Sequence, residues 1–359
     1  MSKNLTKSGM AILLSLISYG AYAVPGESIT LDPNSGNYAV IYYGPGRPGH
    51  KPLRSVVFVP STKIVPRINV ILKLGNLNLV SYTYSVSNGQ KSKQPIDSII
   101  FDPVADIVSK VDLPKQNRDI DLNTIAQIDQ MGALSLLTPV GWVGRTTTSR
   151  EGGLRIGWGY EELVSEQDGL QAGATQSGFG FLGLHIPGLG VAQVIGNAGI
   201  TEWPDEGPQG EIGDQLTKLE RNNFVPINVA VPTIAVPVPF DAAILLDRLR
   251  AHVATWQGKQ LVEPVFATQL DRYLVAAADA YRLNNTKAGK EHIETLRNML
   301  EREHKDLDHG DEESSDGKRG ERDNDHKATT QRILIDRLAA RVLDFDLKYV
   351  LQRTRKEHD

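Results

Sequence analysis

The sequence predicts an antiparallel β-sandwich followed by a C-terminal α-helical hairpin or small bundle. Two observations support this prediction. From about residue 26 to residue 240, apolar residues recur with a period of two and are punctuated by Gly, Pro and Asn, a pattern typical of sandwiches. From Asp241 onward the apolar period becomes helical. The length of 359 residues is enough for two domains.

The first residues predict export. Two lysines precede the apolar run Met10–Ile17, and the small-residue motif Ala21-Tyr22-Ala23 follows it, which is the order of parts in a secretory signal peptide. The run is too short to cross a bilayer core of about 30 Å. We therefore expect residues 1–23 to be a signal peptide cleaved after Ala23. The mature chain would be periplasmic or secreted, with no transmembrane segment after cleavage.

The composition excludes several classes of function. The chain has no cysteine, which rules out disulfides, thiolate metal ligands and a cysteine nucleophile. The formal net charge is −4, and it becomes −6 when the two lysines of residues 1–23 are removed. A mildly acidic chain has no overall attraction to nucleic acid, so we expect no nucleic-acid partner.

A hairpin gives the strongest strand signal. Apolar residues alternate over Arg67–Leu74, and Gly75-Asn76 predicts a two-residue turn. The alternation resumes at Leu77 and continues one residue out of phase over Tyr82–Val86, so a bulge is expected near Leu79–Val80. Similar patterns predict strands at Tyr38–Tyr43, Ser55–Val59, Ser98–Phe101, Leu154–Tyr160, Ser177–Ile186, Val191–Ile195 and Asn228–Val238.

The stretch Ser177–Gly190, SGFGFLGLHIPGLG, contains a G-x-G-x-x-G motif. A dinucleotide-binding turn needs a helix directly after the third glycine, and Pro187 forbids one there. We therefore interpret the motif as a glycine-rich strand. Phe179 and Phe181 share one of its faces, and Gly183 shifts the phase so that the next apolar residues pack.

The domain boundary is expected where the period changes. The only helix candidate before it is Leu122–Leu136, and the proline-rich stretch Val225–Pro239 suits a sheet edge or a linker. We therefore expect a β-sandwich domain over residues 24–240 and a helical module over residues 241–359.

Four helices are predicted in the second half. Asp241 is a plausible N-cap for a helix that ends near Trp256. The other three are predicted over Glu263–Tyr281, Thr286–Lys305 and Thr329–Arg353. Residues 306–327 are rich in glycine, serine and charges of both signs, so they predict a solvated flexible loop.

Two groups of segments resemble known proteins. Tyr82–Gly89 with Ser98–Phe101, and Gly169–Phe181 with its G-F-x-F strand, resemble segments of uncharacterised bacterial exported β-sandwich proteins. Leu270–Leu300 and Ile333–Leu351 resemble small helical-hairpin modules appended to extracellular bacterial proteins. The resemblance implies an exported sandwich with an appended module, and it carries over no catalytic residue.

Function is predicted less sharply than fold. The first hypothesis is a non-enzymatic envelope or secreted protein whose sandwich loops bind an extracellular glycan or an envelope protein. Its candidate binding residues are Trp142, Trp158, Glu161 and Glu162, because exposed indole rings stack on sugar rings. The alternative for both tryptophans is a place in the sandwich core. A second hypothesis is a hydrolase of an extracellular polymer that uses acids between Glu161 and Asp168.

The third hypothesis is a calcium-responsive binding protein. Its metal ligands would be Asp306, Asp308, Asp311, Asp323 and Asp325. Carboxylates are the ligands that calcium prefers, but glycine occupies two positions of the loop at which a calcium-binding helix–loop–helix motif has ligands. The alternative is a solvated acidic loop without a metal. The sequence predicts no other cofactor.

Overall fold

The structure is a computed structural model. It describes residues 26–44, 53–75, 79–104, 136–148, 154–161, 169–197, 207–221, 223–304 and 334–356. The predicted signal peptide, the charged loop and the helix candidate Leu122–Leu136, except for its last residue, lie outside the described residues. Contacts divide the chain into two units, Met1–Pro60 with Gly199–Asn222, and Ser61–Ala198 with Asn223–Asp359. This division differs from the boundary expected at residue 240.

The first unit is a small sheet with one helix. Its antiparallel strands follow the order β1 (Ser28–Leu31), β2 (Tyr38–Tyr43) and β3 (Leu53–Phe58), and its helix is α3 (Gly210–Arg221). Ile212 and Leu216 lie one helical turn apart and pack on the sheet. Their partners in this cluster are Val40, Tyr42 and Phe58. The sequence predicted β2 correctly, but the prediction of no helix here other than Leu122–Leu136 was wrong.

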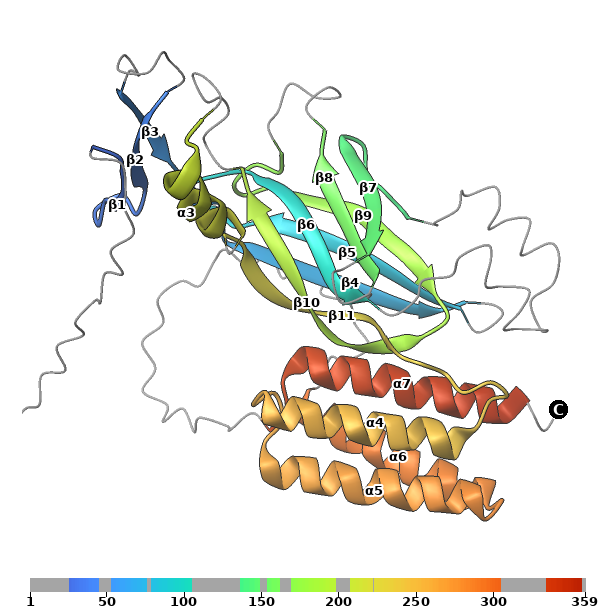
Figure 1. Cartoon of the computed structure of the whole chain (residues 1–359). Coiled ribbons are helices and arrows are strands. Elements are labelled where there is room, and N and C mark those ends of the chain that lie inside the picture. The colour runs from blue at the N-terminus through green and yellow to red at the C-terminus, as the bar shows by residue number, and fades with distance from the viewer. Residues whose placement is uncertain are drawn as a thin grey trace, which may run out of the picture. The chain divides into compact units, whose positions relative to one another are not determined.

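The second unit contains an antiparallel sandwich, which confirms the predicted fold class. One sheet has the strand order β4, β5, β9, with bounds Pro66–Leu74, Val80–Asn88 and Thr175–Gly183. The other has the order β11, β10, β6, β8, β7, with bounds Val225–Ile234, Ile186–Gly196, Ile96–Val104, Leu154–Tyr160 and Trp142–Thr148. Figure 1 shows the strands of both sheets.

The predicted hairpin is present as β4 and β5, but its connection is longer than expected. The ladder starts at the pair Leu74 and Val80 and runs without a shift to Pro66 and Asn88. The N–H of Gly75 donates to the carbonyl of Leu79 at 2.8 Å and closes the connection. Leu79 therefore belongs to the loop, which makes the expected two-residue turn and bulge unnecessary.

Aromatic rings fill the space between the two sheets. The Tyr84 ring lies 4.7 Å from the Phe101 ring, and the Phe179 ring lies 5.0 Å from Trp142. The ring centroids of Trp158 and Phe179 are 5.7 Å apart. Such edge-to-face contacts add to the stabilisation from burying these large apolar side chains.

The glycine-rich stretch is a strand, as predicted, but it ends earlier. β9 stops at Gly183 and β10, in the opposite sheet, begins at Ile186. Gly178 has a φ of +99° and is the extra residue at a shift in the pairing of β5 with β9. Gly180 lies so close to β5 that an added Cβ would stand 2.4 Å from the carbonyl oxygen of Tyr82. The glycines therefore serve strand packing.

Gly180→Ala should destabilise the protein by about 1–3 kcal/mol, because the atom that the new methyl group meets is backbone and has little freedom to move. The matched control is Gly159→Ala in β8, where an added Cβ meets nothing within 4 Å. It should change the free energy of unfolding by less than about 1 kcal/mol. Urea unfolding of both variants measures the difference. Equal stabilities would contradict the close packing of β9 on β5.

The described helices α4 (Ala242–Gly258), α5 (Pro264–Arg282), α6 (Thr286–Glu303) and α7 (Arg337–Lys356) form a bundle. The Asp241 carboxylate accepts from the N–H of Ile244 at 3.0 Å, which confirms the predicted N-cap. Helix α7 begins later than predicted, because Ile335 pairs with Val262 in an isolated bridge before the helix starts.

The bundle and the sandwich share one core. Helix α7 lies against β10 and β11 (Figure 1), and one continuous apolar cluster contains both sandwich strands and helices α4–α7. Leu274 and Leu296 are fully buried in it, whereas Leu338 is only half-buried.

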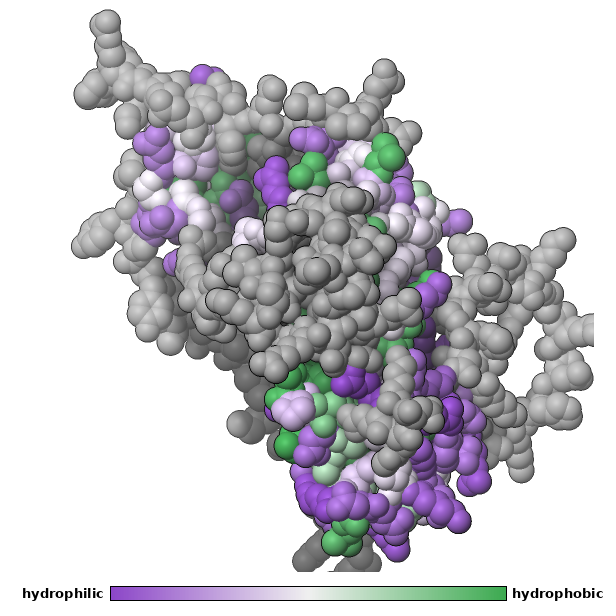
Figure 2. Space-filling view, turned by 90° about the vertical axis from the view of Figure 1, so that its right-hand side faces the viewer, coloured by the Kyte–Doolittle hydropathy of each residue, from purple (hydrophilic) through white to green (hydrophobic). Residues whose placement is uncertain are grey.

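The bundle face in Figure 2 mixes hydrophilic residues with isolated apolar ones. Within the described residues, none of the helices combines the length and the apolar character that a membrane crossing requires.

Candidate functional site

The outer face of the five-stranded sheet carries a groove whose floor has no side chains. In β8, Ile156 and Trp158 point into the sandwich core, so the alternate residues Gly157 and Gly159 point outward. An added Cβ at Gly159 would meet nothing within 4 Å, and one at Gly157 would make only ordinary contacts at 3.4 and 3.6 Å. The space above the two glycines is therefore open.

Neighbouring strands form the walls of this groove. Gly159 lies opposite Ser98 of β6 and Val143 of β7, and Gly157 lies opposite Ile100 and Arg145. The groove has a volume of about 340 Å³. Because β6 and β7 stand two strand spacings apart, its width is about 10 Å.

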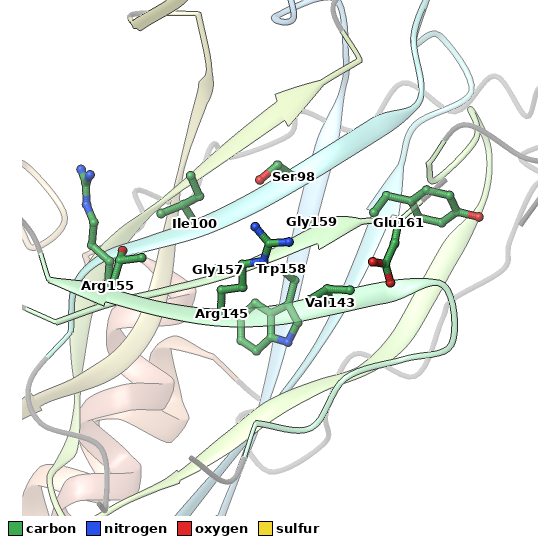
Figure 3. Close-up of a pocket in the computed structure, with 11 residues that line it drawn as sticks. Ser98, Ile100, Val143, Arg145, Arg155, Gly157, Trp158, Gly159 and Glu161 are labelled. Atoms are coloured by element: carbon green, nitrogen blue, oxygen red, sulfur yellow. The ribbon is translucent and has the colours of Figure 1, made fainter. Parts of the chain in front are cut away.

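Charged side chains mark the length of the groove. Arg145 comes from β7, Arg155 from the start of β8, and Glu161 directly follows β8. Figure 3 shows the Arg145 guanidinium extended over β8 beside the two glycines, with Arg155 and Glu161 toward opposite ends. The groove therefore has a cationic end and an anionic end. The hydroxyl groups of Ser98 and Thr147 also line it.

Of the predicted binding residues, the two tryptophans lie in the core and Glu161 lies in the groove. The Trp142 and Trp158 side chains are 7% and 1% exposed, and the Trp158 indole N–H donates to the carbonyl of Leu137 at 3.1 Å. Both rings are core residues and offer no open face to a sugar. Glu161 is half-buried at one end of the groove, and Glu162 lies outside the described residues.

The predicted calcium ligands also lie outside the described residues, in the segment 305–333. Among the residues that the structure does describe, no group of three or more His, Cys, Asp or Glu side chains could hold a metal ion. The calcium site stays a prediction.

A buried carboxyl group lies away from the groove, in α7. Asp346 is 0% exposed, and neither carboxyl oxygen has a hydrogen-bond partner in the described structure. Burial raises the pKa of Asp346 well above its ordinary value, and the nearby charge of Asp344 raises it further. The neighbouring hydroxyl of Tyr82 is already used, because it donates to the carbonyl of His185 at 2.9 Å.

Sequence reasoning missed the groove, although a signal for it was present. The segment Ile156-Gly-Trp-Gly-Tyr160 alternates large apolar residues with glycine. When the apolar residues face the core, the same alternation leaves two successive outward positions empty. Arg145 was missed because its strand, β7, was not predicted.

Comparisons with known proteins add little. No known family model matches the chain, and no curated protein matches it. Among solved structures, a similar one is the crystal structure of an uncharacterized protein from Nocardia farcinica with an immunoglobulin-like fold, at 9% sequence identity and a TM-score of 0.24. The match covers 46% of this chain and 98% of that chain. A likeness this weak supports no conclusion about the present chain.

Proposed function

We propose that the protein is a non-enzymatic envelope or secreted protein that binds an extracellular glycan in the groove above Gly157 and Gly159. The observation that supports this proposal is the open floor above Gly157 and Gly159, with hydroxyl and guanidinium groups on the neighbouring strands and the Glu161 carboxylate at one end. The open floor leaves room for a sugar ring, and the ring's hydroxyls can pair with these hydrogen-bonding groups. The predicted signal peptide would place the groove outside the cytoplasm.

The position of the groove favours a glycan over a peptide that adds a strand. Strand addition needs an unpaired sheet edge. The floor strand β8 is paired with β6 on one side and with β7 on the other. A ligand in this groove is therefore recognised through side chains and through its own hydroxyls.

The hydrolase hypothesis would need a second acid beside Glu161. Glycoside hydrolysis uses a pair of carboxyl groups about 5–9.5 Å apart. Within the described residues, Glu161 is the carboxylate among the groove-lining residues. Any partner between Glu162 and Asp168 lies outside them. Shortening of a bound oligosaccharide during incubation would favour the hydrolase over the binding protein.

Gly159→Val tests the proposed site. Valine suits a β-strand, and its side chain would occupy open space, so the variant should fold normally and fill the groove. We expect the mature chain to bind glycans on an array, and we expect Gly159→Val to lose that binding without a fall in Tm.

The matched control is Ser87→Val, which adds an apolar group to the outward face of β5 in the other sheet and should leave binding unchanged. An array that shows no glycan binding, or binding that survives in Gly159→Val, would contradict the proposal.

A further inference from the structure

We propose that the glycan in this groove is acidic and that Arg145 holds a ring carboxylate. This inference rests on the proposed function and specifies its ligand class. The Arg145 guanidinium lies over the floor of the groove, beside Gly157 and Gly159 (Figure 3).

Arg145 differs from those arginines that are held by carboxylates, and it shares its lack of a partner among the described residues with Arg67, Arg272 and Arg302. Arg250 pairs with Asp271 at 2.8 Å, and Arg297 pairs with Asp344 at 2.8 Å. Within the described parts of the chain, Arg145 makes no ion pair and no side-chain hydrogen bond, and it is exposed. Its guanidinium can therefore accept a ligand without losing a partner among these residues.

The chemistry of guanidinium selects a carboxylate. Its planar fork donates two parallel hydrogen bonds to the two oxygens of a carboxylate, and such charge-assisted pairs are stronger than bonds between neutral groups. Arg155 adds positive charge toward the same end of the groove.

Glu161 fixes the orientation of the ligand. A carboxylate at the far end of the groove repels a second acidic group and accepts hydrogen bonds from hydroxyls. The ligand therefore lies with its acidic group beside Arg145 and with neutral hydroxyls beside Glu161. A uronic acid residue within an oligosaccharide has both kinds of group.

Calorimetry with oligogalacturonate and with its fully methyl-esterified form tests the inference. The ester keeps the rings and the hydroxyls but removes the negative charge. We expect the wild-type chain to bind the acid about 10- to 100-fold more tightly than the ester. Arg145→Gln should remove this preference, and Arg145→Lys should restore part of it, since lysine keeps the charge without the fork.

The outcomes separate this inference from the proposed function. Equal binding of acid and ester that Gly159→Val abolishes would overturn the acidic ligand and leave the glycan site standing. No binding of either probe, together with a silent glycan array, would overturn both. Arg145-dependent binding of oligoglutamate without binding of oligogalacturonate would show an acidic peptide ligand and overturn the glycan class.

Discussion

Asp346→Asn should stabilise the protein at pH 7, because burial, with the nearby charge of Asp344, raises the pKa of this carboxyl group and disfavours its charged form. Asp346 is buried in α7 without a hydrogen-bond partner in the described structure. If this carboxyl group is charged at neutral pH, the charge lies in an apolar environment close to Asp344. If it is neutral, the folded chain must keep a proton that the unfolded chain releases. Both states make folding less favourable. Asparagine has nearly the same shape and carries no charge.

The pH dependence follows from the direction of the shift. The pKa of Asp346 is raised in the folded state above its ordinary value of 3.8, so the folded chain holds this proton more tightly than the unfolded chain. Stability from this group is therefore fully present below about pH 4 and is lost as the pH rises toward the folded-state pKa. The wild type and Asp346→Asn should have similar stabilities below pH 4 and should diverge as the pH rises.

The control lies two residues away and should have the opposite sign. Asp344 is 4% exposed and is paired with Arg297 and with Lys348, each at 2.8 Å. Asp344→Asn removes the buried charge that pairs with Arg297 and leaves this guanidinium only the more exposed Glu294 and Glu301, so it should destabilise the protein at pH 7. Urea unfolding from pH 4 to pH 8 measures both variants. A loss of stability in Asp346→Asn at pH 7 would show that this carboxylate has a stabilising partner.

Leu343→Ala should cost about 2–5 kcal/mol and should weaken the sandwich and the bundle together. Leu343 is fully buried in the apolar cluster that joins sandwich strands to helices α4–α7. A cavity at this position removes contacts from a core that both parts share, so the two should unfold in one transition.

Native tryptophans report on the two parts. Trp158 lies in the sandwich and Trp256 lies in α4, and both are buried. In a background with both Trp203→Phe and Trp256→Phe, the fluorescence of Trp142 and Trp158 follows the sandwich while far-UV circular dichroism is dominated by the helices. Coincident transitions that shift together in Leu343→Ala would support the shared core. Two separate transitions would support the boundary expected at residue 240.

The sequence predicted those elements whose local signals agree with their final environment. The strands Tyr38–Tyr43 and Leu154–Tyr160 have the predicted bounds, and the Asp241 cap was predicted from its position before a helical repeat. Helix α3 was missed because its apolar residues are few and Gly210 and Gly213 lower its helix propensity. Its packing on a sheet formed by residues 28–58 depends on a contact between distant segments, which no local pattern reveals.

The candidate site was predictable only in part. Glu161 was identified as an acid that follows a strand, and the structure places it at one end of the groove. Both tryptophans were ranked as ligand-binding candidates by residue type, but residue type alone does not tell which face of a strand a ring occupies. The pairing of β8 with β6 and β7 decides which of its side chains point into the core. The β6–β8 pairing joins residues far apart in the sequence, such as Ser98 and Gly159, so no local pattern reveals it.

The absence of native cysteine allows a direct test of whether the ligand occupies the groove above Gly157 and Gly159. Gly159→Cys creates a unique thiol on the open floor, and Val265→Cys creates one on the exposed surface of α5, at a residue that is 73% exposed. The measurement is the rate of alkylation of each thiol with and without saturating oligogalacturonate. The ligand should slow alkylation at position 159 at least about tenfold, because a bound ring excludes the reagent, and should leave alkylation at position 265 unchanged. Unchanged alkylation at position 159, while calorimetry shows the ligand bound, would show that the ligand binds elsewhere on the protein.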